Sequence, residues 1–233
     1  KVKNADLVLA TDPVGDRLGV YVNVAKTGEY HSLTGNMSGC LLAEYTISQI
    51  KEKQGLPEDG ALIKTIVTTN LADAIAKSYG IRLIECLTGF KYIGQQILGF
   101  EQSGKGTYLF GFEESYGCLI GTHARDKDAI VATMALCEAA AYYKKQGKTL
   151  WDQMLAIYDK YGYYKDSVKS VTMKGIEGLA KIAQTMENLR ANAPENIGPY
   201  KVLQARDYKL DTCKNSGDRK STRLNSSHHF ISY

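Results

Sequence analysis

Residues 63–87, IKTIVTTNLADAIAKSYGIRLIECL, alternate between the patterns of a strand, a helix and a second strand. The first strand is predicted over Ile63–Val67, a short run in which apolar and β-branched residues dominate. Leu71–Tyr79 has the spacing of a helix and is followed by Gly80, a residue that commonly ends helices. Ile81–Leu87 predicts the second strand. Two strands joined by one helix are typical of an α/β domain.

The alternation continues on both sides of this segment. Further helices are predicted over residues 40–53, 90–98, 126–146 and 150–161, and a further strand over residues 107–112. We therefore expect an α/β fold, with a Rossmann-like mixed sheet that is flanked by helices on both faces.

The two ends of the chain follow other patterns. At the N-terminal end, Leu7–Ala10 predicts a buried strand, Leu18–Val22 predicts a second strand, and the glycines of residues 28–39 predict a loop and a domain boundary. At the C-terminal end, a strand over Lys169–Met173 and a helix over Gly175–Arg190 predict an incomplete α+β unit.

Four regions are therefore expected: the end of one domain over 1–35, an α/β domain over 36–160, the start of another domain over 161–218, and a non-native tail over 219–233. Residues 220–229 have no helical or strand period and resemble translated adaptor sequence. The sequence also lacks an initiator Met and enters its first strand almost at once. We expect the chain to be part of a longer protein.

The composition is that of a globular protein and points to neither a nucleic-acid nor a membrane partner. The sequence is 44% hydrophobic and 23% charged, and it has no apolar run of the roughly 20 residues that span a membrane. Three of its 29 basic residues and none of its 25 acidic residues lie in residues 219–233, so without them the net charge falls from +4 to +1. The five cysteines form no C-x-x-C pair, which favours reduced thiols in a cytoplasmic protein.

The loop after the first strand carries two carboxylates. Its sequence, DPVGDR over residues 12–17, places Asp12 and Asp16 where they can converge on a hard cation such as Mg²⁺. Arg17 beside them suits a phosphate group, which a guanidinium binds through two hydrogen bonds. The same composition also favours an ordinary turn, so the spacing alone leaves both interpretations open.

The loop after the strand at residues 107–112 is a candidate sugar site. The run GFEESYG places Glu113, Glu114 and Ser115 directly after an apolar strand, which is where open α/β sheets bind ligands. Carboxylate and hydroxyl oxygens suit the vicinal hydroxyls of a sugar, although a solvated turn has the same composition.

Two further polar runs are candidates for contacts to the substrate, whereas a third is excluded as a phosphate-binding loop. Lys91, in the run TGFK, is either a contact to phosphate or a solvated lysine at a helix start. In the run RDKD, Asp126 or Asp128 is expected to cap the next helix, with a substrate contact through Arg125 as the alternative. The run GKGT at residues 104–107 is not a phosphate loop, because it precedes a strand instead of a helix.

Taken together and in this order, these runs resemble the α-D-phosphohexomutase family, most of all its bacterial α-phosphoglucomutase branch. That family has four domains, with a metal loop of the type D-P-D-x-D-R in the second and a sugar loop of the type G-E-x-S in the third. The runs TGFK, FGFEESYG and RDKD are similar to the phosphoglucomutase branch, and TGN at residues 34–36 is similar to the link between the second and third domains. The resemblance covers about residues 4–215.

The resemblance implies a reaction and a set of roles. A phosphorylated serine gives its phosphoryl group to a hexose phosphate, and the sugar bisphosphate that forms turns over and returns the other phosphate to the serine. Glucose 1-phosphate and glucose 6-phosphate are the implied substrates, and glucose 1,6-bisphosphate is the implied activator. The roles implied are Mg²⁺ binding for Asp12 and Asp16, phosphoryl binding for Arg17, sugar binding for Glu113 and Ser115, and a place near the substrate for Lys91. Glu114 receives no binding role.

Two departures from the family pattern bear on activity. Val14 stands where the family has its middle metal-binding aspartate, and valine has no oxygen to offer. The sequence also contains neither a T-A-S-H-N-P-like serine loop nor an R-x-S-G-T-E-P-like phosphate loop. We therefore expect this chain by itself to be inactive as a mutase.

Other functions stay open at this point. Mannose or pentose phosphates are alternative substrates within the same family. A phosphatase of the haloacid-dehalogenase type would use Asp12 as its nucleophile, but it needs a second aspartate where Val14 stands. A sugar-phosphate-binding module without catalysis is the third alternative.

Overall fold

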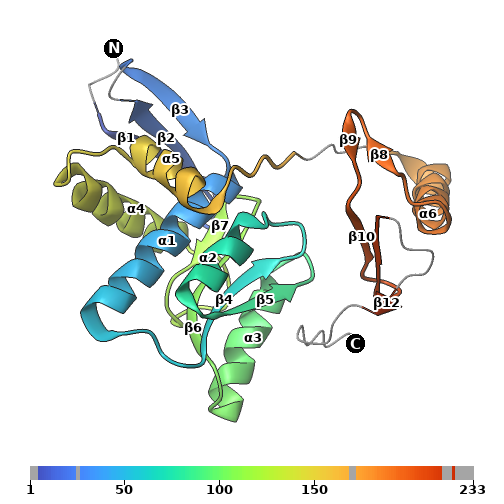
Figure 1. Cartoon of the computed structure of the whole chain (residues 1–233), viewed down its shortest axis with the longest axis horizontal. Coiled ribbons are helices and arrows are strands. Elements are labelled where there is room, and N and C mark those ends of the chain that lie inside the picture. Colours follow the sequence, from blue (N-terminus) through green and yellow to red (C-terminus); the bar gives the residue numbers. More distant parts are fainter. Residues whose placement is uncertain (1–4, 25–26, 168–171, 217–221, 224–233) are drawn as a thin grey trace. The chain divides into compact units, whose positions relative to one another are not determined.

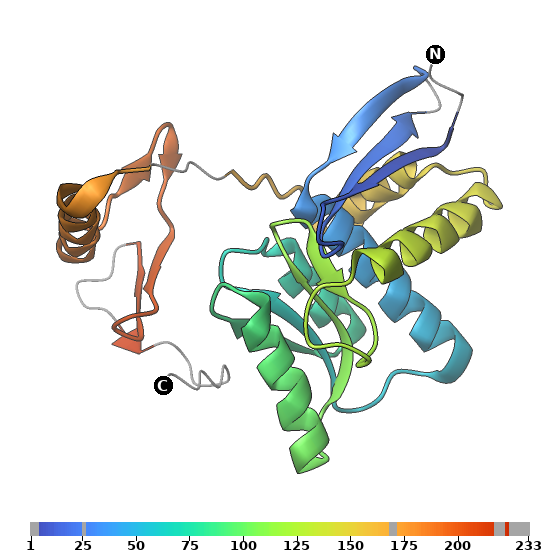
Figure 2. The same ribbon diagram turned by 180° about the vertical axis from the view of Figure 1, so that it is seen from behind.

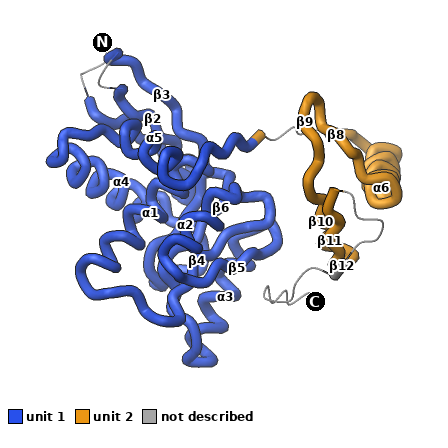
Figure 3. The backbone as a smooth tube through the Cα atoms, in the orientation of Figure 1, with its two compact units in different colours: residues 1–166 blue, residues 167–233 orange. Residues whose placement is uncertain are grey.

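A computed structural model describes residues 5–24, 27–167, 172–216 and 222–223. The chain divides into two compact units, Lys1–Asp166 and Ser167–Tyr233, which are coloured separately in Figure 3. The predicted metal and sugar loops both belong to the first unit.

The centre of the first unit is the predicted mixed sheet. Its strands, in the order in which they lie side by side, are β5 (Arg82–Cys86), β4 (Gly60–Thr65), β6 (Thr107–Glu113) and β7 (Gly117–Leu119). β4 pairs in parallel with both β5 and β6, and β7 returns antiparallel to β6. The prediction of a mixed α/β sheet is confirmed.

Helices cover both faces of this sheet (Figures 1 and 2). The helices of this region are α1 (Gly35–Gln54), α2 (Leu71–Tyr79) and α3 (Phe90–Ser103). On one face, Leu62, Phe110 and Phe112 belong to a core cluster that includes buried residues of α1 and α2. On the other face, Ile63 of β4 packs in a second cluster with Ile93 of α3. The period-2 alternation of each strand therefore supplies two cores.

A second, antiparallel sheet carries the N-terminal part of the unit. Its strands, in spatial order, are β1 (Leu7–Thr11), β2 (Leu18–Val24) and β3 (Glu29–Leu33). Val20 and Val22 are fully buried, on the side where α4 (Ala129–Lys144) and α5 (Leu150–Tyr161) contact the sheet. The prediction that residues 7–10 are buried is wrong, because β1 is an edge strand and Val8 is 46% exposed.

The start of α1 also differs from its prediction. The sequence predicted a loop through residue 39, whereas the helix begins at Gly35 with Thr34 as its N-cap, whose hydroxyl accepts from Met37 N at 3.2 Å. The glycines serve close packing: a Cβ at Gly39 would lie 2.1 Å from the ring of Phe112. A residue type that usually breaks helices is here required by the contact between the helix and β6.

The second unit is small and rich in exposed apolar side chains. It consists of α6 (Gly175–Ala191), the hairpin β8 (Asn196–Ile197) with β9 (Tyr200–Lys201), and the antiparallel strands β10 (Gln204–Asp207), β11 (Thr212–Asn215) and β12 (Thr222–Arg223). Arg190 Nε on α6 lies 3.0 Å from Asp207 Oδ2 on β10.

Two predictions for this region need comment. Of the strand predicted over Lys169–Met173, residues 169–171 lie outside the described residues, and the last two residues are not in a strand. In the predicted tail, Thr222 and Arg223 pair with β11, so these two residues have a strand structure that the sequence did not predict. The rest of residues 219–233 lies outside the described residues.

Among the helices that the structure describes, none combines the length and the apolar character that crossing a lipid bilayer requires.

Candidate functional site

The sequence runs singled out above meet in the first unit. The predicted metal loop is the hairpin turn between β1 and β2, and Leu18 N at its end donates to Tyr116 O of the sugar loop at 3.0 Å. Ala129 N at the start of α4 donates to Gly15 O of the same hairpin at 3.0 Å. Gly89 N of the TGFK run donates to Glu113 Oε1 at 3.0 Å. Backbone and side-chain hydrogen bonds thus bring all four runs into one region.

Lys127 lies at the centre of this region. Its Nζ is 3.1 Å from Asp16 Oδ2 and 2.8 Å from Asp126 Oδ1, and its side chain is only 9% exposed. The ammonium also lies 5.4 Å from the centroid of the Phe90 ring, within the range of a cation–π interaction. A Cβ at Gly117 would lie 1.9 Å from Lys127 Cδ, so the glycine of the sugar loop leaves the space that this side chain occupies.

The two carboxylates of the metal loop have different partners. Asp12 Oδ1 accepts hydrogen bonds from Asp16 N at 3.0 Å and Arg17 N at 3.3 Å, which closes the turn. Burial opposes ionisation of Asp12, but hydrogen bonds with the Asp16 side chain and with the backbone outweigh it and lower the pKa of Asp12. Asp16 Oδ1 is buried and accepts no hydrogen bond from the described residues, while Arg17 Nε lies 3.9 Å away.

This donor set fits a hard cation only in part. A buried carboxylate oxygen without a hydrogen bond, beside a second carboxylate, is what a Mg²⁺ site offers. Val14, however, is 81% exposed and provides no ligand atom. Within the described residues, no group of three or more Asp, Glu, His or Cys side chains is arranged to hold a metal ion. The loop therefore contains two carboxylates at the predicted metal site.

Glu113 is the buried acid of the sugar loop. It ends β6, is 5% exposed, and accepts from Gly89 N through Oε1. Burial raises the pKa of Glu113, an effect that the positive charge of Lys127 and the Gly89 hydrogen bond oppose. This carboxylate lies at the carboxyl end of the strand, where the sequence predicts contacts to ligand hydroxyls.

The other residues of the sugar loop are more accessible. Ser115 is half-buried, and its hydroxyl makes none of the hydrogen bonds found among the described residues, so it is available to a ligand. Glu114 Oε2 accepts from the hydroxyls of Thr65 at 3.2 Å and Thr68 at 3.3 Å. Tyr116 has a φ of 69° and is 44% exposed. A positive φ at a residue other than glycine is uncommon and needs support from its surroundings.

Two predicted site residues have exposed side chains. Lys91 is exposed, and its Nζ lies 4.9 Å from the centroid of the Tyr92 ring. Arg17 is 53% exposed at its side chain. Each of these side chains has a contact to a neighbouring residue, Arg17 with Asp16 and Lys91 with Tyr92, and each remains accessible to a ligand.

The run before α4 is partly as predicted. Asp128 caps the helix by accepting from Ile130 N at 2.9 Å and Val131 N at 3.0 Å, which confirms the capping prediction for this residue. Arg125 instead donates to Thr122 O at 2.7 Å and forms an ion pair with Glu101. Its guanidinium is therefore engaged in holding the loop that precedes the helix.

Sequence reasoning missed three side chains that shape the site. These are Lys127, Glu114 and Lys64, the last of which is a fully buried lysine in β4. A signal was present for two of them. Lys64 is a charged residue inside an apolar strand, and Lys127 stands between two aspartates at a helix start. For Glu114 the sequence analysis named the residue without a binding role, and it did not predict the contacts with Thr65 and Thr68.

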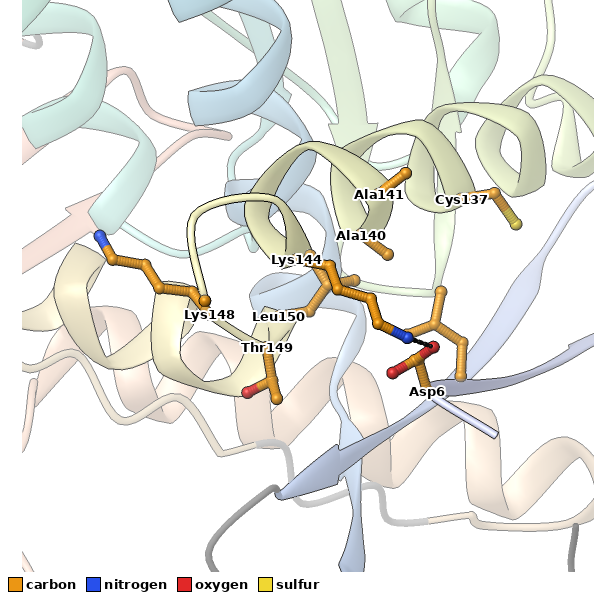
Figure 4. A pocket seen from close by; sticks show the side chains of 10 residues that line it. Asp6, Cys137, Ala140, Ala141, Lys144, Lys148, Thr149 and Leu150 are labelled. Carbon is orange, nitrogen blue, oxygen red and sulfur yellow. Dashed lines mark hydrogen bonds and ion pairs between the residues drawn. The ribbon is translucent and has the colours of Figure 1, made fainter. Parts of the chain in front are cut away.

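A cavity lies in the first unit, away from the metal and sugar loops. It has a volume of about 580 Å³ and is shown in Figure 4 between the start of β1, the end of α4 and the start of α5. Its lining includes Cys137, Leu150 and the ion pair between Lys144 Nζ and Asp6 Oδ2 at 2.7 Å. None of the residues that line it belongs to the metal or sugar loops.

Known families and proteins match this chain. The sequence model of a family described as phosphoglucomutase/phosphomannomutase, alpha/beta/alpha domain III, matches residues 34–161. A phosphoglucomutase of Staphylococcus aureus (strain N315) is 34% identical over 224 residues, which is 96% of this chain and 39% of that protein. A phosphoglucomutase of Staphylococcus epidermidis (strain ATCC 12228 / FDA PCI 1200) is 37% identical over 207 residues, 88% of this chain and 36% of that protein. The chain thus spans less than half the length of these relatives.

Solved structures share the fold. The open form of parafusin, a phosphoglucomutase from Paramecium, matches with a TM-score of 0.60 at 21% identity over 94% of this chain and 34% of that one. A putative phosphomannomutase from Thermus thermophilus matches with a TM-score of 0.52 at 24% identity over 67% of this chain and 31% of that one.

Proposed function

Because this chain belongs to the phosphoglucomutase/phosphomannomutase family, we propose that it is part of an enzyme that interconverts glucose 1-phosphate and glucose 6-phosphate. One observation carries the proposal beyond family membership: the metal loop, the TGFK run and the sugar loop contact one another in one unit. A hexose phosphate has a ring with hydroxyls and a charged group, and it needs acceptors and cations in one place. The region around Lys127 supplies both.

In this proposal the sugar loop binds the ring. Glu113 and Ser115 accept and donate hydrogen bonds to the sugar hydroxyls, and the buried position of Glu113 makes those bonds strong because water does not compete. Lys91 and Arg17, both exposed, provide positive charge for the phosphate groups. Such charge also stabilises a phosphoryl group while it is transferred.

The metal loop would hold Mg²⁺ through Asp12 and Asp16. When bound, the ion would offset negative charge on the transferring phosphoryl group. Lys127 already neutralises one oxygen of Asp16, and it keeps that carboxylate in place beside the turn. The absence of an oxygen at Val14 leaves this loop with weaker metal binding than a loop of three aspartates would have.

The reaction also needs a phosphorylated serine, and the sequence has no T-A-S-H-N-P-like loop of the kind that carries it in the family. A phosphorylated serine would give its phosphoryl group to one oxygen of the hexose phosphate, and the bisphosphate would return its other phosphoryl group to the serine. We propose that the serine comes from the length of the relatives that this chain does not cover, and that glucose 1,6-bisphosphate activates the complete enzyme. We also propose a cytoplasmic location, since all five cysteines are free thiols.

The test is an assay of two proteins. The 233-residue chain alone should not convert glucose 1-phosphate to glucose 6-phosphate, whereas the chain joined to the flanking regions of a relative should do so in the presence of the bisphosphate. Release of inorganic phosphate would indicate a phosphatase, and binding of glucose 1-phosphate without turnover by the joined protein would indicate a binding module. Either of these outcomes would contradict the proposal.

A variant pair tests the sugar loop within that assay. Glu113→Ala should lower kcat/KM by roughly tenfold to a hundredfold, because an unpaired polar group in a buried site costs about 1–3 kcal/mol. Glu52→Ala, at an exposed acid near the end of α1, is the matched control and should leave the rate unchanged. Equal losses in the two variants would place the sugar contacts elsewhere.

A further inference from the structure

Lys64 has a buried ammonium group with an unusual number of partners. The side chain is fully buried in β4. Its Nζ lies within 3.3 Å of five oxygen atoms, which belong to Asp73, Asn70, Glu85, Thr68 and Thr69. A buried ammonium loses its hydration, so it persists only where several oxygens replace the water.

The positions of these oxygens show which segment of the chain the lysine restrains. Asp73 at 2.5 Å and Glu85 at 3.3 Å supply the negative charge. The other three oxygens, two of them backbone carbonyls, come from residues 68–70, the turn between β4 and α2. An ion pair alone would not restrain the backbone of this turn. Here the ammonium donates to the backbone carbonyls of Thr68 and Thr69 and so restrains the conformation of the turn.

The same turn contacts the sugar loop. The hydroxyls of Thr65 and Thr68 lie 2.7 Å apart, and both reach Glu114 Oε2. Thr69 N donates to Asn36 Oδ1 at 3.2 Å, which ties the turn to the first residues of α1. A Cβ at Gly35 would lie 2.1 Å from Glu114 O, so the start of α1 also packs closely against the sugar loop.

We propose that Lys64 is a positioning residue for substrate binding, which acts by fixing the turn at residues 65–70 and, through Glu114, the conformation of residues 113–117. The proposal rests on the proposed function of that loop in binding sugar hydroxyls. The loop needs such support, because Tyr116 has a φ of 69° and the acids beside it must hold one orientation. Lys64 itself touches no ligand in this scheme, since it is fully buried.

The main test compares Lys64→Met with Met154→Ala in the full chain. Met154 is fully buried on α5, outside both the turn and the sugar loop, so its variant controls for a general loss of stability. Backbone amide exchange is measured in both. At equal unfolding free energy, Lys64→Met should speed exchange at residues 114–117 by at least about tenfold relative to Met154→Ala, as expected for local opening. Equal exchange in the two variants would overturn the proposal.

A second variant covers the case in which Lys64→Met does not fold. Thr68→Val keeps the shape of the residue and removes the hydroxyl that reaches Glu114. It should shift the amide resonances of residues 114–116, whereas Thr133→Val, which removes a hydroxyl bonded within α4, should not. Unchanged resonances in Thr68→Val would overturn the proposal.

Titration with α-D-glucose 1-phosphate separates this inference from the function on which it rests. If the unmodified chain binds the sugar phosphate, Lys64→Met should weaken binding by at least about tenfold, a loss of about 1.4 kcal/mol, and Met154→Ala should not. If the unmodified chain does not bind, the sugar-binding role of the loop is contradicted, while the exchange comparison still decides whether Lys64 positions it.

Discussion

The ammonium nitrogen of Lys127 lies 3.1 Å from Oδ2 of Asp16, so a residue just before α4 neutralises a carboxylate of the hairpin between β1 and β2. The lysine side chain is almost completely buried, and it contacts Phe90 and the space beside Gly117 as well. A single side chain therefore fills the centre of the region where the four runs meet.

Replacement of Lys127 by methionine should destabilise the first unit. Methionine fills the same space but removes the ammonium that lies beside the partly buried carboxylate of Asp16, and the loss of such a partner costs about 1–3 kcal/mol. Denaturant unfolding followed by linear extrapolation measures the change. Lys91→Met is the matched control, since that exposed lysine should change stability by no more than about 0.5 kcal/mol. Equal effects in the two variants would show that Lys127 does not hold the loops.

The raised pKa of Glu113 should appear in the pH dependence of stability. Burial makes the folded-state pKa higher than the unfolded one, so the folded chain binds a proton more tightly than the unfolded chain does. The wild type should therefore lose stability relative to Glu113→Gln as the pH rises from below the unfolded pKa through the folded pKa. Unfolding free energies of both proteins from about pH 4 to pH 7 give this difference.

Asp59 provides a control of opposite sign. A hydrogen bond from Thr107 and a second from Gly106 N lower the pKa of Asp59. Its contribution to stability is present above the unfolded pKa and is lost as the pH falls through the folded one. Relative to Asp59→Asn, the wild type should therefore gain stability as the pH rises. If the wild type gained stability with pH relative to both Glu113→Gln and Asp59→Asn, the raised pKa of Glu113 would be refuted.

A carboxylate at position 14 should strengthen metal binding. The loop now offers two carboxylates, and Val14 is exposed at its tip, so Val14→Asp adds a third without disturbing the core. We expect the affinity for Mg²⁺ to rise by at least about tenfold, or about 1.4 kcal/mol. Calorimetric titration of the chain with Mg²⁺ measures this, and the variant of the completed enzyme should gain in rate by a similar factor. Gln102→Asp, at the far end of α3, controls for added charge. Superimposable titrations of Val14→Asp and the parent would withdraw the metal assignment of Asp12 and Asp16.

Deletion of residues 219–233 should leave the first unit unaffected. The described residues of this segment, Thr222 and Arg223, pair with Thr212 and Cys213 of the second unit. The thermal midpoint of the first unit should therefore stay within about 1 °C, as for changes remote from a core. The fluorescence of Trp151, the single tryptophan of the chain, reports on that unit because it stacks edge-on against His31. A drop of several degrees in its transition would show that the tail stabilises the first unit.

The fold was predictable wherever local sequence and tertiary structure agree. The bounds predicted for α2 and α5 are those observed, since Gly80 adopts the left-handed conformation after the first and Thr149 forms a capping box with Asp152 before the second. The start of α1 was missed because its glycines are determined by contacts with β6 and the sugar loop. The exposure of β1 was missed because an apolar run of four residues does not reveal whether a strand lies at a sheet edge.

The candidate site, too, was predictable from the sequence only in part. The runs that contain Asp12, Asp16 and Glu113 were recognisable from composition and from resemblance. That they lie together depends on hydrogen bonds between distant segments, which no local pattern encodes. The roles of Lys64 and Glu114 depend on the turn after β4, and only the three-dimensional arrangement shows that this turn lies against the sugar loop.

The hydrogen bond from Leu18 N to Tyr116 O has a mechanical consequence. It joins the loop proposed for the metal to the loop proposed for the sugar, and Gly35 at the start of α1 lies close against Glu114 O of the sugar loop. The two loops are therefore linked directly, although the sequence predicts a domain boundary between them. A displacement of one loop relative to the other would break this hydrogen bond, so the position of each loop depends on that of the other.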